Sequence, residues 1–284
     1  MGKKKKDTME LRFYEVPQGE YVLALLGDNW IRDYGHDESN LHFHNLMEIG
    51  YCKNGTGELI LNEETKRYEP AMVSIIPQNY PHVTISDIAE GPSYWEYLFF
   101  DPMVMIQELY PDNAVMQKKV LQMINRKALF FHEWENRGIS VLVKMLMDEM
   151  RQKKNHFNDC VRGLLIAFFA ELLRMCESDV SENEVKKKTG VSQITAALDY
   201  VRLEYANNIR VEELAKASHM SETHFRRVFE SYMNMSPMDY INLMRVQKAC
   251  DIMKKTNDPM DVVAQKVGSV SYTHLRAHET LSDL

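Results

Sequence analysis

Three histidines and one glutamate in the first third of the chain have the types and the spacing of a binding site. His42, His44 and Glu48 follow one another in the order His-x-His-x-x-x-Glu, and His82 comes later in the segment PQNYPH. Residues two apart on a β-strand point to the same side, so His42 and His44 can share a site. Imidazoles and a carboxylate suit a divalent ion such as Zn²⁺, Mn²⁺ or Fe²⁺. We expect structural or ligand-contacting histidines and no required cofactor, with a bound divalent metal as the alternative.

Aromatic residues accompany these groups in the sequence, at Trp30, Tyr51, Tyr80 and Trp95. Rings combined with a few polar side chains inside a pocket suit a sugar or another small polar effector. Packing in a hydrophobic core is the alternative for most of them, because aromatic rings bury large apolar surfaces. These four residues are therefore candidates for an effector pocket.

A second set of residues, in the C-terminal third, has the chemistry of base recognition. In the segment SETHFRRVFE, Thr223, Arg226 and Arg227 lie on the polar side of a predicted helix. Arginine can donate two hydrogen bonds to guanine, and threonine can contact the methyl group of thymine. Thr223 and Arg227 are four residues apart and so share one helix face. A solvated charged face without a nucleic-acid partner is the alternative.

The pattern around this segment predicts two helices joined by a tight turn. Val211, Leu214 and Ala215 form one apolar face, and the small Ala215 lets the two helices cross closely. The turn falls at His219–Met220, and Ser221 is the expected N-cap of the second helix. Two helices joined in this way can place the second one in the major groove of DNA.

The motifs of the C-terminal region resemble those of the AraC/XylS family of bacterial transcription regulators. The resemblance covers residues 192–268 and rests on four motifs, which are A-x-x-S-x-M-S-x-x-x-F-x-R-x-F (Ala215–Phe229), M-S-P-M-D-Y-I (Met235–Ile241), R-V-Q-K-A (Arg245–Ala249) and D-V-V-A-Q-K-V-G (Asp261–Gly268). His219 departs from the pattern, because the family tends to have a small or β-branched residue there.

This resemblance implies a sequence-specific DNA-binding regulator, either an activator or a repressor, and not an enzyme. It implies a recognition helix at 221–232 and a long helix at about 238–256 that leads to a second helix-turn-helix unit. The DNA-contacting residues that it implies are Ser221, Thr223, His224, Arg226, Arg227, Ser236 and Arg245. The implied partners are double-stranded promoter DNA, a small-molecule effector, a second copy of the chain in a homodimer and, for an activator, RNA polymerase.

The N-terminal motifs resemble those of the cupins. The segment from His42 to Glu48, with Gly55 after it, resembles the first cupin motif, and PQNYPH resembles the second, although Asn79 stands where that motif has glycine. The resemblance implies that His42, Glu48 and their partners contact an effector or a metal. A metal-dependent cupin enzyme with an appended helical domain is therefore the rival function.

The sequence after Gly268 departs from the regulator pattern. Val270–Thr280 reads VSYTHLRAHET, which is the translation of a string that resembles a transposon-end adapter used in sequencing libraries. We therefore expect residues 270–284 to be a non-native tail and the second helix-turn-helix unit to be incomplete. A natural tail is the alternative, and it would leave that unit without a recognition helix.

The elements that position these residues change character along the chain. Between residues 10 and 101, apolar alternation predicts strands at YVLALLG, LMEIGYC, GELILN, MVSIIP, HVTIS and YWEYLFF, and Asn54-Gly55 indicates a tight hairpin. From Pro111 the apolar period becomes helical. The sequence predicts an α+β protein with a cupin-like barrel or jelly roll at 1–110, a helical dimerisation or packing region at 111–177, a linker at 178–191, a DNA-binding domain at 192–269 and the tail at 270–284.

Composition sets the broad class of the protein. The chain has 284 residues and a net charge of −7, and its four cysteines form no CxxC pair. Reduced thiols favour a cytoplasmic protein, and no apolar stretch is long enough to span a membrane. Residues 192–269 contain ten basic and ten acidic residues. Contacts to DNA must therefore come from individually placed cations rather than from a basic domain.

Overall fold

The computed structural model describes residues 10–35, 41–62, 64–178, 194–233 and 235–268. The chain divides into two compact units, Met1–Lys187 and Lys188–Leu284. The predicted linker, apart from its first residue, and the predicted tail at 270–284 lie outside the described residues.

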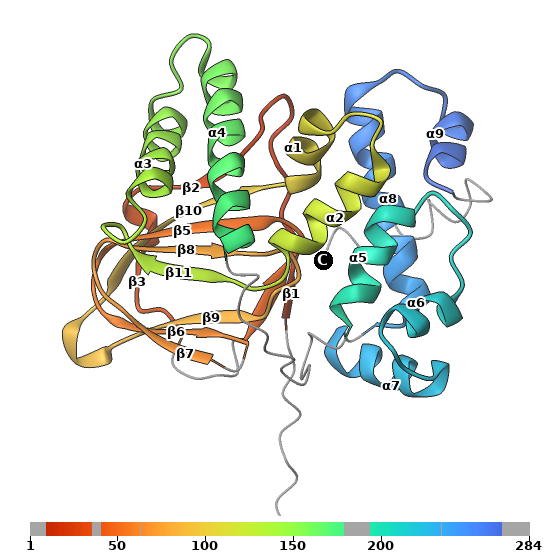
Figure 1. The fold of residues 1–284 in the computed structure, drawn as a ribbon, viewed down its shortest axis with the longest axis horizontal. Helices are drawn as coiled ribbons and strands as arrows, with labels where there is room; N and C mark the ends of the chain where they lie inside the picture. Colours follow the sequence, from red (N-terminus) through yellow and green to blue (C-terminus); the bar gives the residue numbers. More distant parts are fainter. Residues whose placement is uncertain (1–9, 36–40, 63, 179–193, 234, 269–284) are drawn as a thin grey trace, which may run out of the picture. The chain divides into compact units, whose positions relative to one another are not determined.

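The first unit is built on two β-sheets (Figure 1). One sheet has the strand order β1 (Glu10–Arg12), β4 (His42–His44), β9 (His82–Ser86), β6 (Gly57–Leu61) and β7 (Glu64–Tyr68). The other has the order β11 (Leu129–His132), β8 (Met72–Ile76), β5 (Met47–Asn54), β10 (Ser93–Phe100) and β2 (Leu23–Leu25), with β3 (Ile31–Arg32) also pairing with β10. Short 3₁₀ helices, η1 (Asp28–Trp30) and η3 (Ile88–Glu90), precede β3 and β10.

The predicted α+β class is confirmed, and the sheets are open. Within the described residues no strand pairing joins one sheet to the other, so the strands do not close into a barrel. All six strands predicted from apolar alternation are present, and most pairings are antiparallel, whereas β1 and β4 run parallel.

Alternation along β10 separates the interior of the unit from its helical cover. Trp95, Tyr97 and Phe99 share one face and pack against one another, with ring centroids 6.0 and 6.3 Å apart along this row. Phe100 points the other way and meets Phe168 of the helical layer edge-on at 6.0 Å. This period-two pattern is what a strand buried on both faces requires.

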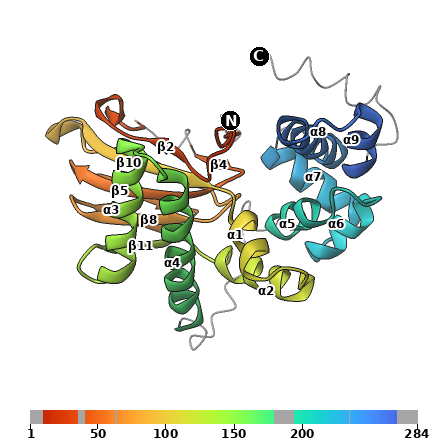
Figure 2. The ribbon, with the colours of Figure 1, turned by 90° about the horizontal axis from the view of Figure 1, so that it is seen from above.

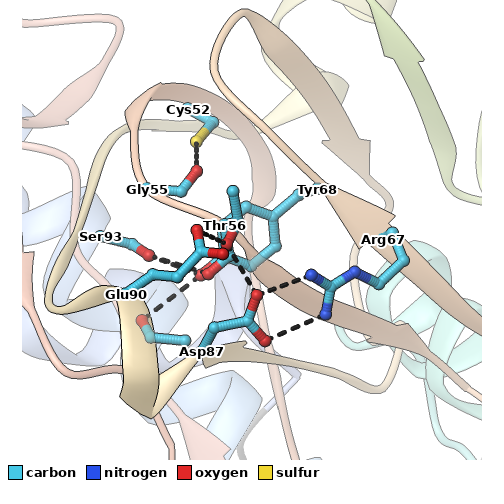
Figure 3. Close-up of polar contacts among 9 residues, drawn as sticks. Cys52, Gly55, Thr56, Arg67, Tyr68, Asp87, Glu90 and Ser93 are labelled. Carbon is cyan, nitrogen blue, oxygen red and sulfur yellow. Dashed lines mark hydrogen bonds and ion pairs between the residues drawn. The ribbon is translucent and has the colours of Figure 1, made fainter.

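Gly55 leads the chain from one sheet to the other, which corrects the hairpin expected there. β5 pairs with β8 and β10, whereas β6 pairs with β7 and β9, so the strands that flank Gly55 belong to different sheets. Gly55 has a φ of +91°, and a Cβ atom at this position would overlap Ser93. Next to it, Thr56 donates a hydrogen bond of 2.7 Å to Asp87, whose two oxygens accept from Arg67 at 3.0 and 2.6 Å (Figure 3). Glycine is needed here for a corner rather than for a two-residue turn.

Helices cover the six-stranded sheet. They are α1 (Pro102–Leu109), α2 (Ala114–Ile124), α3 (Arg137–Gln152) and α4 (Phe157–Ser178). Both views show α3 and α4 side by side against the sheet that contains β10 (Figure 1, Figure 2). Helical structure thus begins at Pro102, earlier than predicted. The region expected to be helical also contains strand β11, which pairs with β8. A short apolar run such as that of β11 has no period that distinguishes strand from helix.

The second unit is helical throughout its described part. Its helices are α5 (Thr195–Glu204), α6 (Val211–Ala217), α7 (Glu222–Met233), α8 (Pro237–Lys255) and α9 (Met260–Lys266). The predicted apolar faces are buried, since Leu214, Phe225 and Phe229 have no exposed surface. The turn between α6 and α7 contains His219 with a φ of +55°, and its end is fixed by a hydrogen bond of 2.9 Å from Met220 N–H to the Ala215 carbonyl. The helix-turn-helix predicted from the sequence is therefore formed.

No helix in the described ranges combines the length and the apolar character needed to cross a membrane. None of the four cysteines, all of which lie in the described ranges, forms a disulfide, and Cys52 is the buried one.

Candidate functional site

A cavity of about 300 Å³ opens into the first unit, and both sheets contribute to its walls. Its lining combines aromatic rings with charged and imidazole side chains: Arg12, Tyr14, Leu25, Trp30, Arg32, Asp33, Tyr34, Gly35, His42, Glu48, His82, Val83, Thr84, Tyr97 and Phe99. The size is at the lower end of small-molecule sites, and a few polar groups among rings are typical of such sites.

Three of the four predicted polar groups converge in a buried cluster, and Glu48 and His82 of this cluster line the cavity. His44 Nε2 lies 3.1 Å from Glu48 Oε2, and His82 Nε2 lies 3.5 Å from the same oxygen. The three residues are 0, 4 and 2 % exposed. His44 and His82 come from β4 and β9 of the five-stranded sheet, whereas Glu48 comes from β5 of the other sheet. The fold thus brings together groups from three strands in a buried cluster.

Backbone carbonyl groups determine which ring nitrogens carry hydrogen in this cluster. His44 Nδ1 donates to the Leu46 carbonyl at 2.7 Å, and His82 Nδ1 donates to the Tyr80 carbonyl at 2.9 Å. A carbonyl oxygen can only accept, so a neutral imidazole in either place presents the Nε2 lone pair to Glu48. Burial is the largest effect on His44 and lowers its pKa, which favours the neutral ring. A neutral His44 ring therefore directs its Nε2 lone pair toward the Glu48 carboxylate.

His42 faces the cavity but stands apart from the three converging atoms. It lies directly opposite His82 in the β4–β9 pairing, with ring centroids 4.4 Å apart. Its Nε2 is 3.3 Å from Nη1 of Arg12, which also donates from Nη2 to Glu10 at 3.0 Å. The ligand atoms that lie within 4.8 Å of one another belong to His44, Glu48 and His82. His42 is therefore placed to contact a bound molecule together with Arg12.

Of the four aromatic residues predicted to form an effector pocket, Trp30 is the one that lines this cavity. Trp95 is 1 % exposed and belongs to the hydrophobic core. Tyr51 points toward the helical side of β5, where its hydroxyl donates to Glu133 at 2.9 Å. Tyr80 packs against the same core as Trp95. These three residues lie outside the lining of this cavity, because the direction of a ring depends on strand register that composition does not reveal.

The sequence did not single out Tyr34, Tyr97 or Arg32, which also line the cavity. Tyr97 could have been found, because it lies two residues from Trp95 and so shares its strand face. Burial raises the pKa of Tyr34 to about 12, so its hydroxyl remains protonated and donates to the Trp30 carbonyl at 2.8 Å. The guanidinium of Arg32 lies 4.3 Å from the centre of the Trp30 ring, a cation–π contact. No local pattern marked Tyr34 or Arg32.

Helix α7 presents the candidate DNA-contacting face. Its apolar side is buried through Phe225, Val228, Phe229 and Met233. Thr223, His224 and Arg227 are exposed on the outer side. Arg227 Nη2 donates to His224 Nδ1 at 3.1 Å, so the two side chains lie together on this surface. The exposed face of α7 thus presents a hydroxyl, an imidazole and a guanidinium group that can contact base edges in a DNA groove.

Three further residues that the resemblance implies as DNA contacts form hydrogen bonds within the second unit. Arg226 donates to Glu222 on its own helix at 3.0 and 2.7 Å. Ser221 accepts a long hydrogen bond of 3.4 Å at the start of α7, and Ser236 Oγ accepts from the Asp239 N–H at 3.2 Å as the N-cap of α8. Both serines serve as helix caps, and serine is among the residues that are preferred at this position.

Arg245 joins α8 to the end of α5. Its Nε donates to the Tyr205 carbonyl and its Nη2 donates to the Asn207 carbonyl, both at 2.9 Å. These carbonyls lie just beyond the last turn of α5, where the helix leaves acceptors unpaired and favours a cation. From the sequence, Arg245 was expected to contact a DNA phosphate. The structure shows that it also stabilises the unit by joining α8 to the end of α5.

Known proteins resemble this chain along much of its length. The family model described as "Helix-turn-helix domain" matches residues 214–278. The HTH-type transcriptional regulator YdeC of Bacillus subtilis is 23% identical, over 94% of this chain and 89% of the relative. The raffinose operon transcriptional regulatory protein RafR of Pediococcus pentosaceus is 22% identical, over 82% of this chain and 80% of the relative. A solved structure of ToxT from Vibrio cholerae with bound unsaturated fatty acid aligns with a TM-score of 0.40 and 16% identity, over 90% of this chain and 88% of that one.

Proposed function

Because this chain belongs to the AraC-type transcription regulators, which bind DNA, we propose that it couples a small polar effector in the N-terminal cavity to promoter binding through α7. The observation that carries the proposal is the outer face of α7. A helix whose other side is fully packed holds Thr223, His224 and Arg227 on a rigid support. Base-reading side chains need such a support, because recognition depends on their position in the groove.

The cavity supports the sensor half of the proposal. Trp30 with Arg32 above it offers a ring face, while His42, Glu48 and Thr84 offer hydrogen-bonding groups around a small volume. This combination suits a carbohydrate, which has polar edges and apolar faces. RafR, a relative over 82% of this chain, is by its name a regulator of a raffinose operon. We therefore propose a carbohydrate as the effector class.

A homodimer in the cytoplasm completes the proposal. Exposed apolar side chains gather on and beside α3, where Trp134, Val141 and Met145 are 63, 50 and 49 % exposed. Val141 and Met145 are four residues apart and share one helix face. A second copy of the chain is the occupant that this face favours, and RNA polymerase is a further partner for an activator. The His44–Glu48–His82 cluster is proposed as part of the sensor rather than as the site of an enzyme.

Selection from a randomised duplex DNA library tests the DNA-binding half. The full chain is expected to enrich one sequence motif. Arg227→Ala should weaken binding to the enriched duplex by about ten- to hundredfold, since one bidentate arginine contact is worth about 1–3 kcal/mol of discrimination. Binding to scrambled DNA should change much less.

Arg174→Ala is the matched control, because it removes the same charge from an exposed position on α4 of the other unit. Its affinity for the enriched duplex should stay within about twofold of the parent chain. Failure of the parent chain to enrich any motif would refute the proposal. An Arg227→Ala variant with undiminished affinity would show that α7 does not read the DNA.

A further inference from the structure

Helix α2 and the residues just after it carry a row of cations on the surface of the first unit. Residues 114–128 contain four basic and no acidic residues. Lys118, Lys119 and Arg126 are among them, and all three are exposed. Gln122, also exposed, is four residues after Lys118 and four before Arg126, and it is three after Lys119. Residues at these spacings share one side of a helix, so the three cations form a single row, which we call the α2 cation row.

The opposite side of α2 holds this row in place. Val120, Leu121 and Ile124 are at most 2 % exposed. The helix packs against α1 and α4, and Figure 2 shows it beside α1. Its first turn is capped by Asn113, whose side chain accepts a hydrogen bond of 3.0 Å from the Met116 N–H. Side chains on a packed and capped helix are presented from a rigid support, so the cations keep a defined spacing.

The α2 cation row differs from the other charged groups of the unit in its lack of carboxylate partners. Within the described residues, Lys118, Lys119 and Arg126 form no ion pair, whereas most other cations of the first unit do. Lys144, for example, donates to Glu133 at 2.9 Å. The unit as a whole is acidic, with 22 basic and 29 acidic residues in its sequence from 1 to 187. Unpaired cations gathered on an acidic unit favour a polyanionic partner.

The DNA backbone is the polyanion that this chain already meets. Duplex DNA carries one negative charge per about 1.7 Å of its axis. At about 1.5 Å of rise per helical residue, the row from Lys118 to Arg126 is about 12 Å long, which is close to the width of a major groove. Cations at its two ends can therefore reach phosphates on both sides of one groove. The second unit of the same chain binds DNA, which raises the effective concentration of phosphates at the first unit.

We propose that Lys118, Lys119 and Arg126 bind the phosphate backbone of the DNA that flanks the sequence read by α7. The first unit then takes part in DNA binding directly, in addition to sensing an effector. Phosphate contacts carry no base information, so this contact adds affinity for any flanking sequence and leaves the choice of motif to α7. The proposal rests on the proposed function for its partner and adds a second, sequence-independent contact surface.

The affinity of the full chain for two duplexes tests the proposal. Both duplexes contain the selected motif, and one extends it by about two helical turns, or about 20 base pairs, on each side. The parent chain should bind the longer duplex about tenfold more tightly at low salt, whatever the flanking sequence. The triple variant Lys118→Ala/Lys119→Ala/Arg126→Ala should lose this preference and keep the parent's affinity for the short duplex. On the longer duplex, its slope of log affinity against log salt should be less steep by about 2–3, since each phosphate contact contributes about 0.9.

A matched variant separates the row from a general effect of charge. Lys66→Ala/Lys154→Ala/Arg174→Ala removes three exposed cations from other parts of the same unit. It should keep the parent's preference for the longer duplex, and loss of the preference in this variant would overturn the assignment to α2. Circular dichroism and the affinity for the short duplex show that each variant is folded.

Hydroxyl-radical footprinting of the parent chain gives a result that needs no variant. Protection of the backbone is expected to extend beyond the selected motif into the flanking DNA. Equal affinity of the parent chain for the two duplexes, or a footprint confined to the motif, would overturn the proposal. An oligomeric state that depends on the α2 cations, without any preference for flanking DNA, would identify a second copy as the partner and overturn it as well. A chain that selects a motif but ignores its flanks refutes this contact alone, whereas a chain that selects no motif refutes the proposed function too.

Discussion

Replacing Arg245 by alanine distinguishes a stabilising role from a phosphate contact. The variant loses two hydrogen bonds of 2.9 Å to the Tyr205 and Asn207 carbonyls. Hydrogen bonds from a charged donor contribute about 1.5–3 kcal/mol each, and partial exposure reduces this to about 1 kcal/mol each. Arg245→Ala should therefore destabilise the second unit by about 2 kcal/mol, which corresponds to a roughly thirtyfold larger opening constant.

Hydrogen–deuterium exchange of the full chain measures this effect where it occurs. The slowest amides of α5 and α8 should exchange roughly thirtyfold faster in Arg245→Ala, while amides of the two sheets serve as an internal reference. Arg226→Ala is the matched control, because its ion pair with Glu222 is exposed on one helix. It should change exchange by no more than about twofold, as surface pairs contribute little. Unchanged exchange in Arg245→Ala, together with weaker DNA binding, would refute the stabilising role.

Further predictions concern the first unit. Gly57→Ala should destabilise it by about 3 kcal/mol or more, because the added Cβ would overlap the Ile85 carbonyl oxygen. Gly163→Ala should instead stabilise it by about 0.5–1 kcal/mol, because nothing lies within 4 Å of a Cβ at this position on α4. Equal effects of the two variants in thermal melts would contradict this difference in packing. Burial opposes ionisation of Glu96, but hydrogen bonds, chiefly from Arg151, outweigh it and hold the pKa below its usual value of 4.5. Because the pKa of Glu96 is lower in the folded than in the unfolded chain, the ionised carboxylate stabilises the fold above the unfolded value. This contribution is lost as the pH falls through the folded-state pKa. The difference in melting temperature between the parent chain and Glu96→Gln should therefore shrink below about pH 4.5, and a constant difference would contradict it.

Local signals made the elements predictable from the sequence. Period-two alternation identified six strands, and the helix-turn-helix followed from the apolar spacing around Phe225 and from the cap at Ser221. These patterns depend on residues close together in the chain, so they need no knowledge of the fold. The His-x-His-x-x-x-Glu spacing likewise marked His44 and Glu48, which the structure brings together with His82 in a buried cluster.

Features that depend on distant contacts were not predictable. Asn54-Gly55 has the composition of a hairpin turn, yet the strands beside it pair in different sheets. Whether Trp95 lines a pocket or packs in the core depends on register, which a single sequence does not specify. The carbonyl partners of Arg245 lie about forty residues earlier in the chain. From the sequence alone, Arg245 is therefore predicted to contact DNA, and only the folded structure identifies its carbonyl partners.

Effector binding in the cavity should change the affinity of the full chain for DNA. A carbohydrate that raises the melting temperature of the full chain is identified first. Trp30→Ala is expected to abolish this shift, and Val115→Ala, at an exposed residue outside the cavity lining, is expected to retain it. The affinity for the selected duplex is then measured with and without that compound. A change of at least about fivefold is predicted, since coupling between two sites typically spans 5- to 150-fold. A compound that binds at Trp30 and leaves the DNA affinity unchanged would contradict the account.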